Sequence, residues 1–320
     1  MASMREIKRR RSSVQSTQQI TKAMKLISTV KLQKARTNAE NSKPYFECMY
    51  ETVTSMLAKA GNIEHPYLKP GASKKVGIVV VTSNRGLAGG YNSNIVRLIT
   101  GSGIAKEDVR LYTVGRKGSD GLTRKGYEVA ADYSDVIEAP TYADAQALTK
   151  QLLTDFANGE IGEIYVAYTF FKNTVVHIPK LTKLLPVDLD AVKEEAKEEA
   201  SGAQALMSFE PQEEEAIGLL VPKYVTSVLY GAFVEAVASE NGARMQAMDS
   251  ATKNAEEIID DLALKYNRAR QGAITQELTE IIAGAEDVYK RQILYCLNRR
   301  FRLIPEISEE RVWQRIQDFI

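Results

Sequence analysis

The sequence predicts a mixed α/β fold in which a small Rossmann-like domain is inserted between two long terminal helices. Residues 3–43 contain no proline or glycine and place apolar residues at helical spacing. Short β-branched runs then alternate with helical segments, which is typical of a largely parallel sheet. After Pro222 no proline occurs until Pro305, and the helical spacing returns. Because two helices of this length do not fit inside a compact globule, we expect them to pair as an antiparallel coiled coil.

The N-terminal helix is predicted to continue past Pro44 with a kink, because apolar spacing persists from Phe46 to Leu57. The glycines and prolines between Gly61 and Gly71 end it. Its apolar positions form a narrow stripe of the kind that makes a coiled-coil seam. The stripe consists of Ile7, Val14, Ile20, Met24, Ile27, Leu32 and Ala35.

The middle of the chain predicts strands at residues 76–81, 109–114 and 164–170, and a further short strand at 175–178. Helices are expected near residues 94–98 and 143–157. The C-terminal helix is expected over residues 223–285, where it would span about 95 Å at about 1.5 Å per residue. We therefore divide the chain into a discontinuous shaft (1–60 and 216–286), an α/β domain (72–187), an acidic connector (188–215) and a C-terminal tail (287–320).

Charge is segregated along the chain although the total is nearly neutral. The 42 Lys and Arg almost balance the 41 Asp and Glu. Residues 1–36 carry ten bases and one acid, whereas residues 187–216 carry ten acids and two bases. A basic helix of this kind indicates an anionic partner or a solvated face. Two Cys and two His exclude a disulfide scaffold and a Cys/His metal cluster, and no apolar stretch of about 18 residues predicts a membrane span.

No constellation of residues predicts catalysis. Ser83 to Gly90 is a glycine-rich segment between a strand and a helix, where phosphate can bind. Its spacing matches neither GxGxxG nor GxxxxGK[ST], so we favour a structural turn over a nucleotide site. His65 and His177 have no nucleophile partner in the pattern. An enzyme acting alone is therefore disfavoured, and no cofactor or metal is expected.

Three ordered motifs resemble one family. The first is ITKAMKLI at residues 20–27, followed by Lys31, Lys34 and Ala35. The second is TSNRGLAGGYN at residues 82–92. The third combines ASE at 238–240, ARM at 243–245, YNRARQ at 266–271 and ITQEL at 274–278. On these residues the chain resembles the gamma subunit of F-type ATP synthases, of the bacterial type, over residues 4 to about 286.

The resemblance implies a central-stalk rotor that couples proton translocation through the c-ring to ATP synthesis on the beta subunits. The implied partners are the alpha and beta subunits, the epsilon subunit and the c-ring, with no nucleic acid. It also implies a non-catalytic subunit, peripheral on the cytoplasmic face of the bacterial plasma membrane. The sequence does not decide whether the coupling ion is a proton or sodium, nor the size of the c-ring.

Residue roles follow from the same resemblance. The implied contacts with the stator ring are Met24, Lys25, Arg244, Arg268, Arg270, Gln271, Thr275 and Glu277. The implied foot on the c-ring and epsilon comprises Lys31, Lys34, Phe209 and Glu210. Surface or seam packing is the alternative for each residue.

The last segment departs from the family pattern at residues 287–292, DVYKRQ. A nucleotide sequence that encodes this hexapeptide resembles a transposon end used in sequencing libraries. We therefore hypothesise that residues 287–320 are a chimeric or disordered tail, with a genuine extension as the alternative. Two other functions stay open from the residues alone: a basic coiled-coil protein that binds nucleic acid, and a dinucleotide-dependent enzyme.

Overall fold

The computed structural model describes residues 4–59, 65–71, 73–187 and 213–301. The chain consists of two compact units. The larger unit is Gln18–Asn254, and the smaller one combines Met1–Thr17 with Ala255–Ile320. Both terminal helices contribute to both units.

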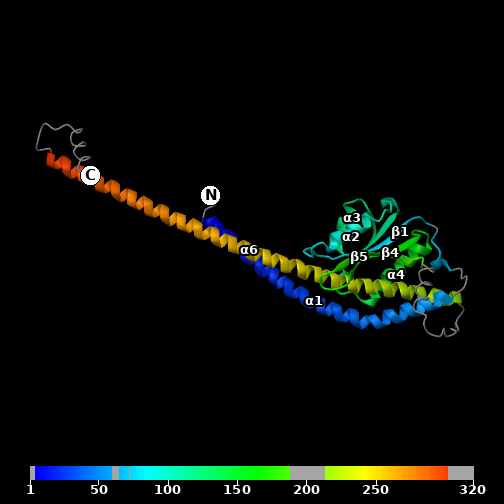
Figure 1. The fold of residues 1–320 in the computed structure, drawn as a ribbon. Helices are drawn as coiled ribbons and strands as arrows, with labels where there is room; N and C mark the ends of the chain where they lie inside the picture. The colour runs from blue at the N-terminus through cyan, green and yellow to red at the C-terminus, as the bar shows by residue number, and fades with distance from the viewer. Residues whose placement is uncertain (1–3, 60–64, 72, 188–212, 302–320) are drawn as a thin grey trace. The chain divides into compact units, whose positions relative to one another are not determined.

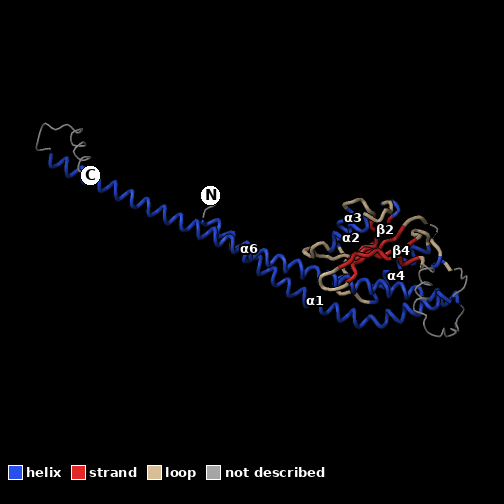
Figure 2. The backbone as a smooth tube through the Cα atoms, viewed as in Figure 1, coloured by secondary structure: helices blue, strands red, loops and turns tan. Residues whose placement is uncertain are grey.

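A five-stranded sheet forms the centre of the larger unit (Figure 2). Its strands are β1 Val76–Val81, β2 Val109–Val114, β3 Glu128–Asp132, β4 Glu163–Phe171 and β5 His177–Leu185. Their order in the sheet is β3-β2-β1-β4-β5. The first four strands are parallel, and β5 pairs antiparallel with β4. The sheet is therefore Rossmann-like with one antiparallel edge strand.

Helices cover both faces of this sheet. The helices α2 Tyr91–Thr100 and α3 Arg116–Thr123 lie on one face, and α4 Tyr142–Ala157 lies on the other together with part of α6 (Figure 1). Successive β1 residues alternate between two apolar cores, so Ile78 and Val80 pack with α2 whereas Val79 and Val81 pack with α4 and α6. Short 3-10 turns occupy Pro66–Leu68, Lys106–Asp108 and Val136–Glu138.

Most of the predicted elements are confirmed, one is wrong, and two elements of the structure were not predicted. The strands 76–81 and 109–114 have the predicted bounds. Helix α4 begins one residue before its prediction, and β4 exceeds its prediction by one residue at each end. The strand predicted at 175–178 is wrong, because β5 begins at His177 and runs to Leu185. Neither α3 nor β3 was predicted, because α3 contains two glycines and β3 is short, with only partly buried or exposed residues.

The two terminal helices are long and continuous. Helix α1 runs over Met4–Lys59 with Pro44 inside it, which confirms that Pro44 does not end the helix. Helix α6 runs over Glu213–Phe301 with Pro222 inside it. It begins before the expected residue 223 and continues past Asp287, so residues 287–301 are helical. Residues 302–320 lie outside the described residues, and the hypothesis of a chimeric or disordered tail stays a prediction. A window of α6 is apolar and long enough to cross a membrane by length and composition, and half of that window is buried within the protein.

In the larger unit, α1 and α6 pair antiparallel along a seam with a seven-residue repeat. The Thr21 and Thr252 hydroxyls are 2.8 Å apart, and Lys25 Nζ lies 2.5 Å from Asp249 Oδ1. The α1 side of the seam is Thr21, Lys25, Ser28, Leu32 and Ala35, all buried or half-buried. The α6 side is Asn241, Met245, Met248 and Thr252.

The predicted stripe was wrong at two positions, since Ile20 is 57% exposed and Ile27 is 58% exposed. Each precedes a seam residue by one position and is turned about 100° away from it on the helix. In the smaller unit the same spacing holds: Ile7 and Val14 are half-buried, as predicted, and Ala255 and Leu262 are buried.

Candidate functional site

The glycine-rich segment after β1 is a hydrogen-bonded turn. The Ser83 N–H donates to Asn92 Oδ1 at 3.0 Å, and the Asn84 side-chain amide donates to the Ser134 carbonyl at 2.8 Å. Leu87 and Gly89 both have positive φ, which only a glycine adopts without strain. Ser83 and Asn84, at the start of this segment, therefore use their polar groups to hold the turn, as expected for a structural turn.

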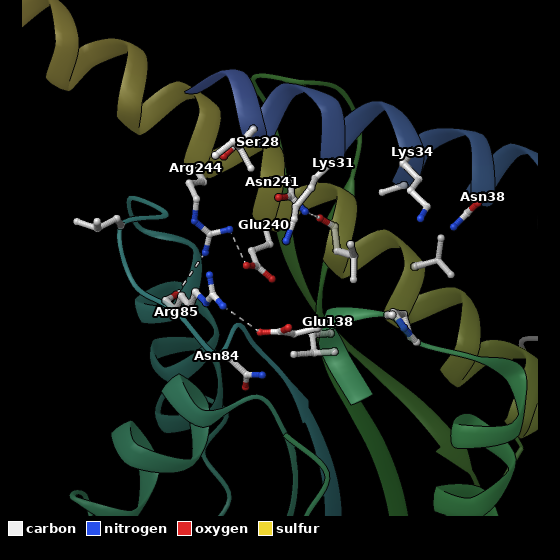
Figure 3. A pocket seen from close by; sticks show the side chains of 18 of the residues that line it. Ser28, Lys31, Lys34, Asn38, Asn84, Arg85, Glu138, Glu240, Asn241 and Arg244 are labelled. Carbon is white, nitrogen blue, oxygen red and sulfur yellow. Dashed lines mark hydrogen bonds and ion pairs between the residues drawn. The ribbon is translucent and has the colours of Figure 1, made fainter. Parts of the chain in front are cut away.

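Arg244 of α6 fastens this turn to the coiled coil (Figure 3). Its guanidinium forms an ion pair with Glu240 at 2.7 Å and donates to the Arg85 and Gly86 carbonyls at 3.4 Å. Both side chains of the pair are largely buried, at 11% and 14% exposure. Burial raises the pKa of Glu240, although the nearby Arg244 opposes that shift. The contacts thus give Arg244 an internal role, and its predicted stator contact stays a prediction.

A cavity of about 700 Å³ lies between this turn, α1 and α6. Lys31 and Lys34 of α1 line it, as do Arg85 and Glu138, which form an ion pair at 3.7 Å (Figure 3). The two lysines predicted as foot residues therefore border the turn, on the coiled-coil side. Phe209 and Glu210 lie outside the described residues.

Met24 and Lys25 lie at the edge of the seam and are half-buried. Lys25 is held by Asp249, and that contact lowers the pKa of the Asp249 carboxyl. Beside them, α1 presents a broad apolar face to solvent. That face, hereafter the α1 apolar face, consists of Ile20, Leu26, Ile27 and Val30, which are 57–70% exposed.

The remaining predicted contacts lie on α6 within the smaller unit. Arg268, Arg270, Gln271, Thr275 and Glu277 are all exposed. Within the described residues neither arginine has an ion pair, whereas the Thr275 hydroxyl donates to the Gln271 carbonyl at 2.9 Å. Exposed apolar residues continue along this part of α6, including Ile274 and Leu278.

Sequence reasoning did not find Asp249 and Thr252, the partners of Lys25 and Thr21, and gave Glu240 no role. A pattern of single residues does not reveal which positions of two antiparallel helices face each other. The seven-residue spacing of Asn241, Met248, Ala255 and Leu262 is the signal that would have found that register. No group of three or more His, Cys, Asp or Glu side chains in the described part of the chain could hold a metal ion.

These features define a class of protein in which an α/β domain is inserted into an antiparallel two-helix coiled coil that leaves apolar and basic side chains to solvent. The family model described as ATP synthase matches residues 3–288. The chain belongs to this family, among the ATP synthase gamma chains. It is 62% identical over 290 residues to the ATP synthase gamma chain of Lachnoclostridium phytofermentans, covering 90% of this chain and 100% of the relative.

A second relative is the sodium ion specific ATP synthase gamma chain of Acetobacterium woodii, 41% identical over 295 residues, covering 88% of this chain and 98% of the relative. Among solved structures, the Tetrahymena thermophila mitochondrial ATP synthase central stalk and c-ring matches with a TM-score of 0.52 and 27% identity, covering 72% of this chain and 99% of that one. A chain of the Euglena gracilis mitochondrial enzyme has the same fold, with a TM-score of 0.65 and 17% identity, covering 90% of this chain and 95% of that one.

Proposed function

We propose that this chain is the central-stalk rotor of an F-type ATP synthase, which couples ion translocation through a membrane c-ring to ATP synthesis on the beta subunits. Its family and its similarity to gamma chains support this assignment. The structural observation that carries it is the α1 apolar face. A monomeric protein rarely leaves a contiguous apolar surface uncovered, and a surrounding ring of subunits would cover it.

The mechanism follows from the asymmetry of the coiled coil. A shaft shifts the equilibrium between conformations of a catalytic site only through contacts that differ between those conformations. On α1 the apolar face and the basic residues Lys31 and Lys34 lie beside a seam that faces the other helix. One direction around the shaft is therefore apolar and basic, while another is occupied by α6. Rotation would present these surfaces in turn to each catalytic subunit.

We assign the contacts with other subunits from the resemblance to gamma chains. Met24 and Lys25 on α1, and Arg268, Arg270, Gln271, Thr275 and Glu277 on α6, would meet the alpha and beta subunits. Lys31 and Lys34, at the cavity beside the turn, together with Phe209 and Glu210, would belong to the foot on epsilon and the c-ring. Through that foot the chain would be peripheral on the cytoplasmic face of a bacterial plasma membrane, with no part in binding nucleic acid.

The test is co-purification of the full chain with alpha and beta subunits, followed by ATPase measurement. We expect Val30→Asp to reduce the ATPase activity of that complex more than tenfold. Val30 is 70% exposed in the free chain, and contact with the ring would remove water from the introduced carboxylate. Thr29→Asp is the matched control, since it adds the same charge one residue away on another side of α1. Failure of the chain to join the ring would contradict the assignment, as would equal effects of the two variants.

A further inference from the structure

A second cavity lies at the point where the strand order of the sheet reverses. The chain passes from β1 to β2 on one side and, later, from β3 to β4 on the other, so the reversal lies between β1 and β4. In open α/β sheets ligands bind at the carboxyl ends of the strands at such a point. A cavity of about 360 Å³ occurs there, lined by Gly89 and Gly90 after β1, Thr169 of β4, His177 of β5 and Ser250 of α6.

Two residues that line this cavity each carry a buried polar atom without a hydrogen-bond partner among the described residues. One is the Thr169 hydroxyl oxygen, in a residue that is only 3% exposed. The other is Nε2 of His177, which is shielded from solvent. Since buried polar groups are nearly always paired, two unpaired groups on one cavity indicate a ligand that supplies the partner.

The cavity also receives the N-terminus of α2. This ten-residue helix begins after Gly90, and no side chain caps it. The N–H groups of its first turn and its dipole favour a negative charge at this end. The Asn94 side chain of the same helix lines the cavity as well. None of the lining residues is charged, so the helix and the polar side chains would supply the attraction for an anion.

The His177 imidazole lies close to α6 at Gly242, which has no side chain in the way. A Cβ atom at Gly242 would lie 2.7 Å from His177 Nε2, so a larger residue there would force the imidazole to move. On β4 its neighbour is the Phe171 ring, with centroids 6.0 Å apart. Burial lowers the pKa of His177, and no charged side chain lines the cavity beside it. At neutral pH the imidazole is therefore neutral, with one N–H to donate.

We propose that this cavity binds a small oxyanion of the phosphate class, whose oxygens accept hydrogen bonds from the Thr169 hydroxyl, His177 Nε2–H and the first turn of α2. This site is separate from the α1 apolar face and from the Arg244 contacts, and it goes beyond the rotor function. A bound anion favours the charged imidazolium. Phosphate binding should therefore raise the pKa of His177, and lowering the pH toward 6 should tighten binding.

The test uses the full chain labelled with ¹³C-histidine, because the sequence holds only two histidines. Inorganic phosphate is titrated against chloride at constant ionic strength while both imidazole resonances are followed. We expect the His177 resonance to move and its pKa to rise, while His65 stays fixed as the internal reference. His177→Gln assigns the two resonances. Equal movement of both, or no movement of His177 with either phosphate or ADP, would overturn the proposal.

Variants and a second probe sharpen the result. Thr169→Val keeps the side-chain shape but removes the hydroxyl, and it should weaken phosphate binding about tenfold. Thr226→Val is the matched control, since Thr226 is also 3% exposed but donates to the Pro222 carbonyl on α6. Equal weakening in both variants would contradict the site, and thermal unfolding checks that both fold. Tighter binding of ADP than of phosphate assigns the site to the phosphate end of a nucleotide, and the reverse order assigns it to the free ion.

Discussion

The sheet of the larger unit and the coiled-coil seam beside it are built on different principles. Helices cover both faces of the sheet, and the β1 residues Ile78, Val79, Val80 and Val81 are fully buried between them. The seam of α1 instead contains Thr21, Lys25 and Ser28, and it leaves the α1 apolar face exposed. Small and polar seam residues let two helices approach closely but bury little apolar surface. The sheet therefore covers its own apolar side chains, whereas the coiled coil leaves part of its apolar surface exposed.

The largest effect should come from opening the core of the sheet. Ile78→Ala removes a fully buried side chain and leaves a cavity, so we expect the free energy of unfolding to fall by about 3 kcal/mol. Urea denaturation of the chain measures this loss. Ile178→Ala on β5 is the control, because that side chain is 37% exposed and should cost under about 0.5 kcal/mol. Similar losses of unfolding free energy in the two variants would mean that the buried core of the sheet is not its main source of stability.

A smaller effect should follow from releasing the turn that joins sheet and coiled coil. Arg244→Ala leaves the largely buried Glu240 carboxylate without its cation, and we expect unfolding free energy to fall by about 2–3 kcal/mol. The double variant Glu240→Gln, Arg244→Met removes both charges. It should recover at least half of the loss in the same denaturation experiment. A double variant as unstable as the single one would show that the ion pair is not what holds the turn.

The third effect is a pH-dependent gain in stability on replacing Glu235. Burial raises the pKa of Glu235 on α6 to about 7, Lys180 opposes the shift, and one carboxylate oxygen has no partner in the described structure. A raised pKa in the folded state gives stability that is present below the ordinary pKa near 4.5 and lost as pH rises through about 7. Glu235→Gln should therefore stabilise the protein by about 2 kcal/mol above pH 7.

The same variant should be no more stable than the parent near pH 4, because the parent carboxyl is then protonated as well. Thermal unfolding at several pH values follows the difference. A constant gain at every pH would point to packing and not to titration.

The smallest effect concerns the seam itself. Lys25 and Lys253 both contact Asp249, and these contacts lower the pKa of the carboxyl. Their contribution is present above the ordinary pKa of aspartate and is lost as pH falls through the lowered value. Exposed ion pairs add little to stability. Lys25→Met should therefore change the unfolding midpoint by no more than the experimental scatter. The Asp249 pKa, followed by carboxyl NMR, should nevertheless move up toward its ordinary value, and more so than in Lys253→Met if the inter-helix contact dominates.

Local pattern was sufficient for the strongest elements of the fold. The buried β-branched run at residues 76–81 reads as a strand because both faces of β1 are covered. The edge strand β5 was misplaced because Pro179 and its alternating polar residues weaken the signal, and its pairing with β4 is a long-range choice. The predicted seam was wrong at Ile20 and Ile27 because hydrophobicity alone does not say which apolar face meets the second helix and which stays exposed.

The sequence by itself determined the long helices, the inserted parallel sheet and the family, because these rest on spacing and on contiguous motifs. Only the tertiary structure decided which residues meet: Lys25 with Asp249, Arg244 with the Arg85 and Gly86 carbonyls, and Thr169 with His177 at one cavity. The physical reason is that Lys25 and Asp249, like Arg244 and the Arg85–Gly86 turn, are far apart along the chain, while Thr169 and His177 meet because β4 pairs with β5. Their proximity depends on helix register and strand order, which are properties of the packed molecule and not of any local segment.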